Sequence, residues 1–439
     1  MARDGFSNTI PLSETTKFIV DNRGKTAPTA EKGIALIATN CITNDHLYPL
    51  YEKLRFVSQE TYDTWFRAHP KPGDILLTNK GSQNGAICLV PDPVNFVIAQ
   101  DMVAIRANEE VIDPLFLFAA LRSPDVQAQI KNLDVSGVIP HFKKTDFDKL
   151  LLPYPNRHTQ KEIGRIYFEL CAKIELNRRM NETLEAMARA LFKSWFVDFD
   201  PVRAKAEGRD PGLPKSLADL FPNSFEDSEL RDIPKGWEPG PFAGTIEILG
   251  GGTPKTSSPE YWNGAIPWFS IVDAPSDTDV WVIDTEKKIT QAGVENSSTQ
   301  ILPVGTTIIT ARGTVGRIAL VGVPMAMNQS CYGLRGKADM HGYYTYFATR
   351  QLVSSLQQRA HGSVFDTITR DTFAGVTVVI PPPHLVEAFE KIVSPTLDRI
   401  RAGLFVSSTL AALCDALLPK LISGELRIND AERIIGKSM

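Results

Sequence analysis

The stretch KPGDILLTNKGSQNGAICLVPDPVNFVIAQDMVAIR at residues 71–106 is echoed by LPVGTTIITARGTVGRIALVGVPMAMNQSCYGLR at residues 302–335. The match continues well outside both stretches; for example, Leu184 in the first copy corresponds to Leu410 in the second. A period of about 230 residues is too long for one unit of a solenoid, so each copy is a whole domain with a connector. The chain is therefore a duplication, and a pseudo-two-fold molecule suits a partner that is itself roughly two-fold.

Both copies predict the same order of elements. A turn rich in Gly, Thr, Pro and Lys comes first, followed by short apolar runs bounded by glycine, which are typical of buried strands. A helical stretch, a polar loop and a last strand stopped by proline complete each copy. In this order, the elements are expected at 24–28, 34–39, 74–78, 86–90, 113–131, 136–147 and 150–155, and at 252–255, 266–271, 307–310, 318–321, 342–359, 362–373 and 376–383.

After each proline stop the apolar residues recur at steps of three and four, which predicts a helix of about 30 residues, or about 45 Å, in each copy. Each helix could simply cover its own domain. A helix this long outruns the face of a small domain, which favours two helices packed antiparallel as a coiled coil that holds the domains apart. The predicted fold class is α+β, with two similar globular domains joined by two long antiparallel coiled-coil helices in a pseudo-two-fold arrangement.

The predicted organisation places the first domain at 1–155, the first long helix at 156–200, a linker at 201–235, the second domain at 236–383, the second long helix at 384–428 and a tail at 429–439. The linker is rich in Pro, Gly and charge, so we expect it to have little structure of its own. Trp237 follows it and is expected to anchor the start of the second copy by packing on the domain.

The bulk composition excludes some classes of protein. With 439 residues, 43% hydrophobic and 22% charged, the chain can form two or three domains with real cores. A net charge of −4 argues against a uniformly basic nucleic-acid coat, although local basic patches remain open. The five dispersed cysteines indicate reduced core residues. Without a signal-like N-terminus or a run of about 18 apolar residues, a cytoplasmic location is expected.

No catalytic motif emerges. The GKT at 24–26 and the GKS at 436–438 both lack the earlier glycine of a phosphate-binding loop. There is no GxGxxG after a strand, and no Asx-Pro-Pro-aromatic tetrapeptide of the kind that amino-methyltransferases use. The triplet at 286–288 (EKK) resembles a fragment of a nuclease site, but charged triplets often arise by chance. The seven histidines show no metal-ligand spacing, so neither catalytic residues nor a metal site are expected.

Several segments resemble the recurrent segments of the specificity subunits of type I restriction-modification systems. They are NRRMNETLEAMARALFKSWFVDFDPV at 177–202, IPKGWE at 233–238, GGTPK at 251–255, TARGTVG at 310–316 and LLPKLISGEL at 417–426. The resemblance covers essentially the whole chain, and these segments are specific because they occur together in this order. The first copy departs from the pattern, since no clear counterpart of IPKGWE stands at its start.

The resemblance implies that each copy is a target-recognition domain that reads one half of an asymmetric bipartite site in double-stranded DNA. The helices would fix the spacer and dock two methyltransferase subunits, which bind S-adenosylmethionine and methylate adenine N6. Two restriction subunits would add translocation and cleavage with ATP and Mg. The chain itself would be non-catalytic and bind no cofactor. Half-sites one helical turn apart are separated by roughly 34 to 36 Å, which a helix of about 45 Å can span.

Candidate DNA contacts are polar and basic side chains in the turns and loops, since these residue types read base edges and bind phosphates. Solvated loop residues remain the alternative for each of them. The matched Gln100 and Gln329 are equally explained as buried structural amides. The candidates are Arg23, Lys25, Lys80, Ser82, Gln83, Asn84, His141, Lys143 and Lys144 in the first copy, and Lys255, Thr256, Ser257, Arg312, Thr314, Ser363, Thr367 and Arg370 in the second.

Candidate contacts to the methyltransferase lie along the first helix: Arg178, Arg179, Phe192, Trp195 and Phe196. Packing of the three aromatic rings against the second helix explains them equally well. Two other classes of function stay open on the sequence. The chain could itself methylate or cut DNA, which the missing motifs disfavour, or it could be a two-headed adaptor for proteins, which the polar turns disfavour.

Overall fold

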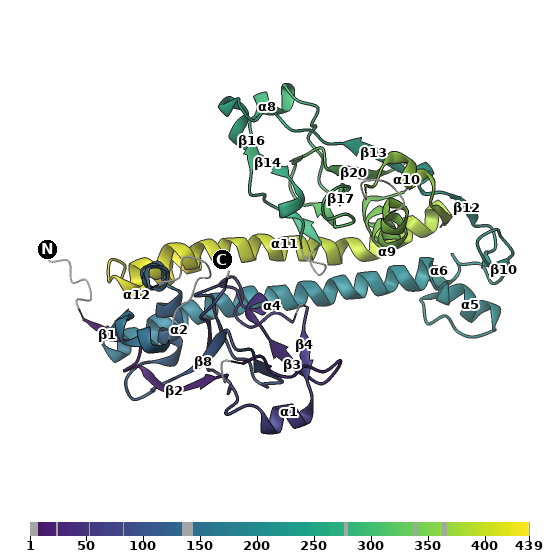
Figure 1. Ribbon diagram of the computed structural model, residues 1–439. Coiled ribbons are helices and arrows are strands. Elements are labelled where there is room, and N and C mark those ends of the chain that lie inside the picture. Colours follow the sequence, from purple (N-terminus) through teal and green to yellow (C-terminus); the bar gives the residue numbers. More distant parts are fainter. Residues whose placement is uncertain are drawn as a thin grey trace. The chain divides into compact units, whose positions relative to one another are not determined.

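The computed structural model describes residues 8–22, 25–51, 53–81, 83–133, 144–275, 280–337, 340–361 and 367–438. The chain divides into two compact units, one formed by residues 1–177 with 406–439 and the other by residues 178–405. Each unit holds one copy of the repeat together with parts of both long helices (Figure 1).

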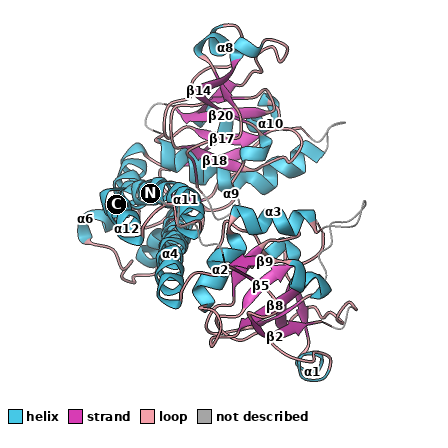
Figure 2. Cartoon of the chain, turned by 90° about the vertical axis from the view of Figure 1, so that its left-hand side faces the viewer, coloured by secondary structure: helices cyan, strands magenta, loops and turns pink. Residues whose placement is uncertain are grey.

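The domain of the first unit is built on short strands. They are β1 Thr9–Pro11, β2 Thr16–Asp21, β3 Ile34–Ile37, β4 Arg55–Val57, β5 Ile75–Thr78, β6 Ile87–Leu89, β7 Phe96–Ile98, β8 Met102–Ala107 and β9 Leu151–Pro153. One sheet has the antiparallel order β2-β8-β5-β6, a second has the order β4-β3-β7 with β3 parallel to β7, and β1 pairs with β9. Figure 2 shows β2, β8 and β5 side by side.

The second unit repeats this construction with β12 Glu238–Pro241, β13 Ile246–Gly250, β14 Trp262–Phe269, β15 Trp281–Val282, β16 Lys288–Ile289, β17 Thr307–Thr310, β18 Ile318–Val321, β19 Ala326–Met327, β20 Cys331–Gly336 and β21 Thr377–Ile380. Its sheets have the orders β13-β20-β17-β18-β15 and β16-β14-β19, with β14 parallel to β19, and β12 pairs with β21. Strand for strand the order matches the first unit, except that β15 extends the larger sheet. The duplication expected from the sequence is confirmed in the topology.

Helices cover these sheets and connect the copies. They are α1 Gln59–Thr64, α2 Pro114–Arg122, α3 Pro124–Asn132, α4 Arg157–Phe196, α5 Asp200–Ala206, α6 Lys215–Ala218, α7 Phe242–Thr245, α8 Gln291–Glu295, α9 Gly342–His361, α10 Arg370–Ala374, α11 Pro383–Ile422 and α12 Ile428–Ser438. The helical stretch predicted at 113–131 is divided between α2 and α3, because the ring of Pro124 suits only the first turn of a new helix. The matching stretch in the second copy is the single helix α9.

The long helices run antiparallel within each unit. In the first unit, Asn177 of α4 donates from Nδ2 to Ser407 Oγ of α11 at 3.2 Å, and Cys171, earlier in α4, shares a core cluster with Cys414, later in α11. In the second unit the ring of Phe192 of α4 lies 5.7 Å from that of Phe389 of α11. Both helices have 40 residues, longer than the sequence periodicity indicated.

Each unit has its own large core. In the first, Ile163 and Leu170 of α4 pack with Leu417 of α11 and with the buried face of α2. In the second, the C-terminal part of α4 and the N-terminal part of α11 enclose aromatic rings such as Tyr344 and Phe347 of α9. The long helices thus bury their apolar stripes against domain as well as against each other, so both interpretations offered by the sequence hold in part.

The segment expected to be a linker is folded, so that expectation is wrong. It contains α5, α6 and the paired strands β10 Phe225–Glu226 and β11 Ile233–Pro234. Val202 and Phe221 are buried, which is why a stretch rich in Pro and Gly nevertheless orders: its few apolar side chains meet the aromatic core. Trp237 is 2% exposed and packs on Phe196 and Phe199, as an anchor of the second copy should.

The second long helix ends earlier than expected. It was predicted to reach residue 428, but α11 ends at Ile422 and the separate helix α12 occupies the tail. Gly424 adopts a positive φ of 75°, and the Leu426 amide donates back to the Lys420 carbonyl at 3.0 Å. Glycine tolerates this left-handed conformation, which commonly ends helices, so the SGE turn stops the helix.

Within the part of the chain that the structure describes, α11 is the one helix long and apolar enough to cross a membrane by length and composition. A core helix passes the same test. Leu385, Phe389 and Leu397 of α11 are buried in the core of the second unit, so the finding is weak evidence for a membrane span.

Candidate nucleic-acid interface

Loops of the first domain converge at one end of the strands of its larger sheet, and this end is called an edge below. Because the strands are antiparallel, the end of β2, the end of β5 and the starts of β6 and β8 fall at the same edge. Asp21 is in register with Val103, and Thr78 with Met102. We call the described residues of the segments 21–26, 79–86 and 99–102 the first loop edge.

The second domain has the matching feature. Gly250 is in register with Tyr332, and Thr310 with Cys331, so the turn after β13, the turn between β17 and β18 and the turn before β20 share an edge. The Ile368 amide donates to the Ala311 carbonyl at 3.0 Å, which adds a fourth loop. We call residues 251–257, 311–317, 328–330 and 367–370 the second loop edge.

A threonine organises the hairpin turn in each edge. Thr78 and Thr310 are fully buried and stand last in β5 and β17. The hydroxyl of Thr78 donates to the Gln83 carbonyl, and the hydroxyl of Thr310 donates to the Thr314 carbonyl. Each threonine oxygen also accepts from the amide that follows the turn, of Ala86 at 2.9 Å and of Arg317 at 3.0 Å. The same frame therefore supports both hairpin turns.

The turn glycines are explained by backbone conformation. Gly81 and Gly85, and likewise Gly313 and Gly316, have φ between 74° and 93°, a region that L side chains rarely adopt. They serve the turn backbone, as the sequence indicated. The polar side chains of the two turns nevertheless differ. The first turn carries the amides of Gln83 and Asn84, whereas the second carries the guanidinium of Arg312 and the hydroxyl of Thr314.

Most of the described candidates are exposed and lie on these edges. Lys25, Gln83, Lys255, Thr256, Ser257, Arg312, Thr314 and Arg370 are exposed, Lys80, Asn84 and Thr367 are partly buried, and Lys144 is exposed at the start of the 3-10 helix η2 Lys144–Lys149. Arg23, Ser82, His141, Lys143 and Ser363 lie outside the described residues. The exposed candidates are accessible to a ligand, which does not test whether they contact DNA.

Carboxylates stand beside Lys80 of the first edge and beside Lys144. Lys80 Nζ lies 3.8 Å from Asp101 Oδ1, and the Lys144 ammonium pairs with the Asp21 carboxylate. Arg370 of the second edge instead donates to the Ile248 carbonyl at 3.0 Å. Solvent screens such exposed pairs, so a phosphate could compete for either lysine.

Gln100 and Gln329 are not buried amides, so that alternative is wrong. Gln100 is partly buried and Gln329 is exposed, and each accepts a hydrogen bond through Oε1 from a threonine hydroxyl, Thr26 at 3.3 Å and Thr253 in the second copy. Sequence reasoning passed over both threonines. Their recurrence in the glycine-containing first turn of each copy is the signal that could have found them.

The aromatic candidates for a partner interface belong largely to the core. Trp195 is 1% exposed and packs against Phe221 and Phe389, so its ring is part of the core of this unit, as the packing alternative predicts. Phe192 and Phe196 are also buried, at 5% and 8% exposed. The packing interpretation accounts for these rings, because side chains of α9 and α11 cover them. The sequence periodicity could not show which apolar side chains would do so.

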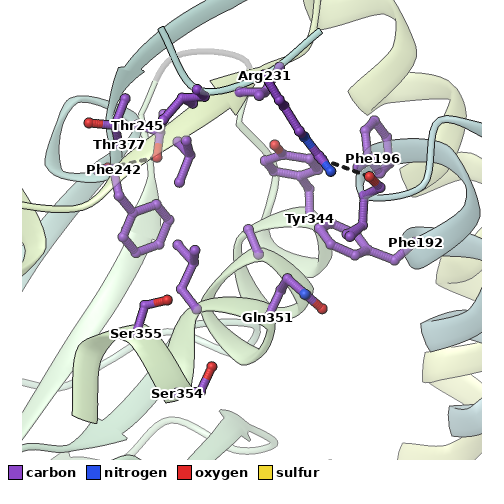
Figure 3. A pocket seen from close by; sticks show the side chains of 16 residues that line it. Phe192, Phe196, Arg231, Phe242, Thr245, Tyr344, Gln351, Ser354, Ser355 and Thr377 are labelled. Atoms are coloured by element: carbon purple, nitrogen blue, oxygen red, sulfur yellow. Dashed lines mark hydrogen bonds between the residues drawn. The ribbon is translucent and has the colours of Figure 1, made fainter. Parts of the chain in front are cut away.

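Phe192 and Phe196 do line a hollow of about 410 Å³ in the second unit (Figure 3). Gln351, Ser354 and Ser355 of α9 lie along another side of it. The hollow leaves part of these rings accessible. Arg178 is partly buried and pairs with Glu182 at 2.5 Å, whereas Arg179 is exposed.

No metal or thiol chemistry stands out at these edges. Within the described ranges, no three His, Cys, Asp or Glu side chains gather in a group that could hold a metal ion. Burial raises the pKa of the Cys331 thiol, beside the second edge, to about 12, so the thiol stays protonated and serves packing. All five cysteines are buried thiols, as the sequence indicated.

The geometry defines a class of protein: one chain with two homologous domains, each presenting a polar loop edge, joined through a pair of long helices. Comparison with known proteins agrees with this two-domain organisation. The family described as "Type I restriction modification DNA specificity domain" matches residues 28–186 and again residues 234–395. The chain belongs to this family. It is a specificity subunit of a type I restriction-modification system, with two recognition domains and no catalytic role of its own.

Individual relatives support the assignment over most of the chain. The HindI specificity subunit of Haemophilus influenzae is 26% identical over 401 residues, which cover 81% of this chain and 87% of the relative. The MjaIX specificity subunit of Methanocaldococcus jannaschii is 23% identical over 371 residues, covering 83% and 80%. The crystal structure of the S subunit from M. genitalium has the same fold, with a TM-score of 0.51, 15% identity and coverage of 94% of this chain and 95% of that one.

Proposed function

We propose that each domain reads one half of an asymmetric, bipartite site in double-stranded DNA through its loop edge. The observation that carries the proposal is the pair of matched turn frames with different outward side chains. Both frames are built by a buried threonine and two glycines of positive φ, yet the first presents Lys80 and Gln83 where the second presents Arg312 and Thr314. Equal frames with unequal side chains are what two readers of different half-sites require.

The long helices would set the gap between the half-sites. A 40-residue helix is about 60 Å long at 1.5 Å per residue, which exceeds the roughly 34 to 36 Å between half-sites one turn apart. The antiparallel pairing within each unit supplies the stiffness that a spacer of fixed length needs. On this proposal, the spacer length in the DNA site is a property of α4 and α11.

The helices would also dock two methyltransferase subunits, which carry S-adenosylmethionine and methylate adenine N6, and through them two restriction subunits that use ATP and Mg. Exposed apolar residues on the helices favour such docking: Leu176 and Met187 of α4 are 58% and 62% exposed. Arg178 and Arg179 remain partner candidates beside them. The chain would bind no cofactor itself and act in the cytoplasm, where its DNA and partners are.

A methylation map of the genome tests the reading of DNA. Cells would express this chain with its cognate methyltransferase, and a second strain would carry residues 1–155 from a divergent homologue. We expect a split adenine-methylated motif of which one half changes with the exchange. A motif that ignores the exchange, or the absence of a split motif, would refute the two-reader proposal and leave the protein adaptor as the better explanation.

Binding to the cognate oligonucleotide tests the basic side chains. Lys80→Ala together with Arg312→Ala should weaken binding and reduce the slope of log affinity against log salt by about 2, roughly 1 for each phosphate that is no longer neutralised. An unchanged slope would exclude phosphate contacts by these residues.

Partner docking has a separate test. Met187→Glu should abolish co-elution with the methyltransferase in size-exclusion chromatography, whereas Val272→Glu, at another exposed apolar position in the second domain, should leave it intact. Equal behaviour of the two variants would mean that this face of α4 is not the docking surface.

A further inference from the structure

The two loop edges share one feature, a glutamine held by a threonine. Gln100 lies between β7 and β8, and Gln329 lies between β19 and β20. The hydroxyl of Thr26 donates to Gln100 Oε1 across 74 residues of sequence, and that of Thr253 donates to Gln329 Oε1 across 76. The hydrogen bond recurs although the neighbouring exposed side chains have diverged.

Satisfying a buried amide does not explain this bond, because Gln329 is exposed and Gln100 is only partly buried. Water could serve either amide oxygen equally well. What the bond does is orient the amide: with Oε1 turned to the threonine, the Nε2 group is turned away from it. Among the described residues Nε2 has no acceptor in either copy, so each edge presents two N–H donors and a second oxygen lone pair.

An oriented glutamine amide has a well-matched partner among base edges. In the major groove, adenine offers the N7 acceptor and the N6 donor, which meet Nε2 and Oε1 of a glutamine in a bidentate pair. Guanine would place its O6 acceptor against Oε1, and pyrimidines lack N7. Because the threonine already limits the side chain, little rotamer freedom is lost when the base binds.

The surroundings of Gln100 suit a polar base edge beside a phosphate. Gln100 lines a hollow of about 290 Å³ together with Asn40, Arg55 and Asp101. Asp101, the next residue in the chain, has its carboxylate 3.8 Å from Lys80 Nζ, so a cation is held beside the residue that follows Gln100. A base contact and a backbone contact are thus available from adjacent positions.

We propose that Gln100 and Gln329 are base-reading residues, each contacting an adenine in its own half-site, and that Thr26 and Thr253 are positioning residues that hold them. The inference rests on the proposed function. It adds that the two half-sites, although different in sequence, share an adenine at the corresponding place.

The test is a methylation map for strains carrying Gln100→Ala or Gln329→Ala in the complete complex. Gln100→Ala should relax one adenine position of the first half-site, with the preference for adenine falling by about 5- to 150-fold, and leave the second half unchanged. Gln329→Ala should do the reverse. Gln59→Ala is the matched control, since this exposed glutamine of α1 lies outside the loop edge and its loss should leave the motif unchanged.

Oligonucleotide competition separates a base contact from a structural role. Replacing the adenine by 7-deazaadenine removes N7, so the wild-type complex should lose affinity while the Gln100→Ala complex should bind both duplexes equally. If Gln100→Ala does not assemble, Thr26→Val, which retains the glutamine but not its hydroxyl partner, should show a smaller relaxation at the same position.

The outcomes separate this inference from the proposed function. Suppose that the wild type gives a split motif and that both glutamine variants leave every position of it unchanged. This result overturns the inference and leaves the proposed function standing. If Gln100→Ala does not assemble, an unchanged motif in Thr26→Val counts in the same way. No split motif in the wild type overturns the proposed function itself.

Discussion

The joint between α2 and α4 in the first unit allows a sharp test of packing, through the substitution Gly164→Ala. Gly164 is buried in α4 against the start of α2. A Cβ added there would lie 2.5 Å from the Phe116 amide nitrogen and 2.8 Å from the Leu115 carbonyl carbon. These are backbone atoms, and the Phe116 amide donates to Asp113 Oδ1, the N-cap of α2. The new methyl group could therefore be accommodated only by moving a capped helix end.

The change in the free energy of unfolding follows from two destabilising effects and one stabilising effect. Ordinary contact needs roughly 3.5 Å, so α2 must retreat by about 1 Å, and such overpacking costs about 1–3 kcal/mol. A weakened N-cap adds about 1 kcal/mol. Alanine in place of glycine in a helix returns about 1 kcal/mol. We expect a net loss of about 1–3 kcal/mol, which for a unit of roughly 200 residues lowers Tm by about 2–12 °C.

Thermal unfolding of the purified chain by circular dichroism and calorimetry measures this, with Gly436→Ala as control. Gly436 is exposed in α12 and nothing lies within 4 Å of an added Cβ, so the same substitution should there stabilise the helix slightly. If Gly164→Ala raises Tm as Gly436→Ala does, α2 and α4 do not approach each other this closely and the packing described for the joint is wrong.

Three further predictions concern the second unit. Trp195→Ala should cost about 3–5 kcal/mol in unfolding, because its ring fills the aromatic core; unchanged stability with lost methyltransferase assembly would instead restore a partner role. Burial raises the pKa of Glu390 above its ordinary 4.5, so this carboxyl contributes stability below that pH and loses it as pH rises. Glu390→Gln should therefore gain stability over wild type with increasing pH, and a pH-independent difference would contradict this. Iodoacetamide at pH 8 should spare the Cys331 thiol, whose pKa burial raises to about 12, until the chain is denatured; rapid labelling of the native chain in peptide mass spectrometry would refute its burial.

Much of the site could be anticipated because it depends on local chemistry. Glycines that must adopt positive φ, such as Gly81 and Gly313, and the runs of β-branched residues beside them are visible in sequence. What could not be anticipated is which loops meet. Thr26 and Gln100 are 74 residues apart, and their contact depends on the pairing of β2 with β8, which no local signal states.

The sequence by itself determined the duplication, some of the strands in each copy, the turn glycines and the two long helices. These follow from repetition and from periodicity, which are properties of neighbouring residues. Tertiary structure decided the rest. It buried Trp195 rather than exposing it, ordered the segment around Phe221 and brought Gln100 and Gln329 against threonines of another loop. The physical reason is that the sequence shows which apolar stripes and amides require a packing or hydrogen-bond partner. Only the fold determines which side chain, distant in sequence, becomes that partner.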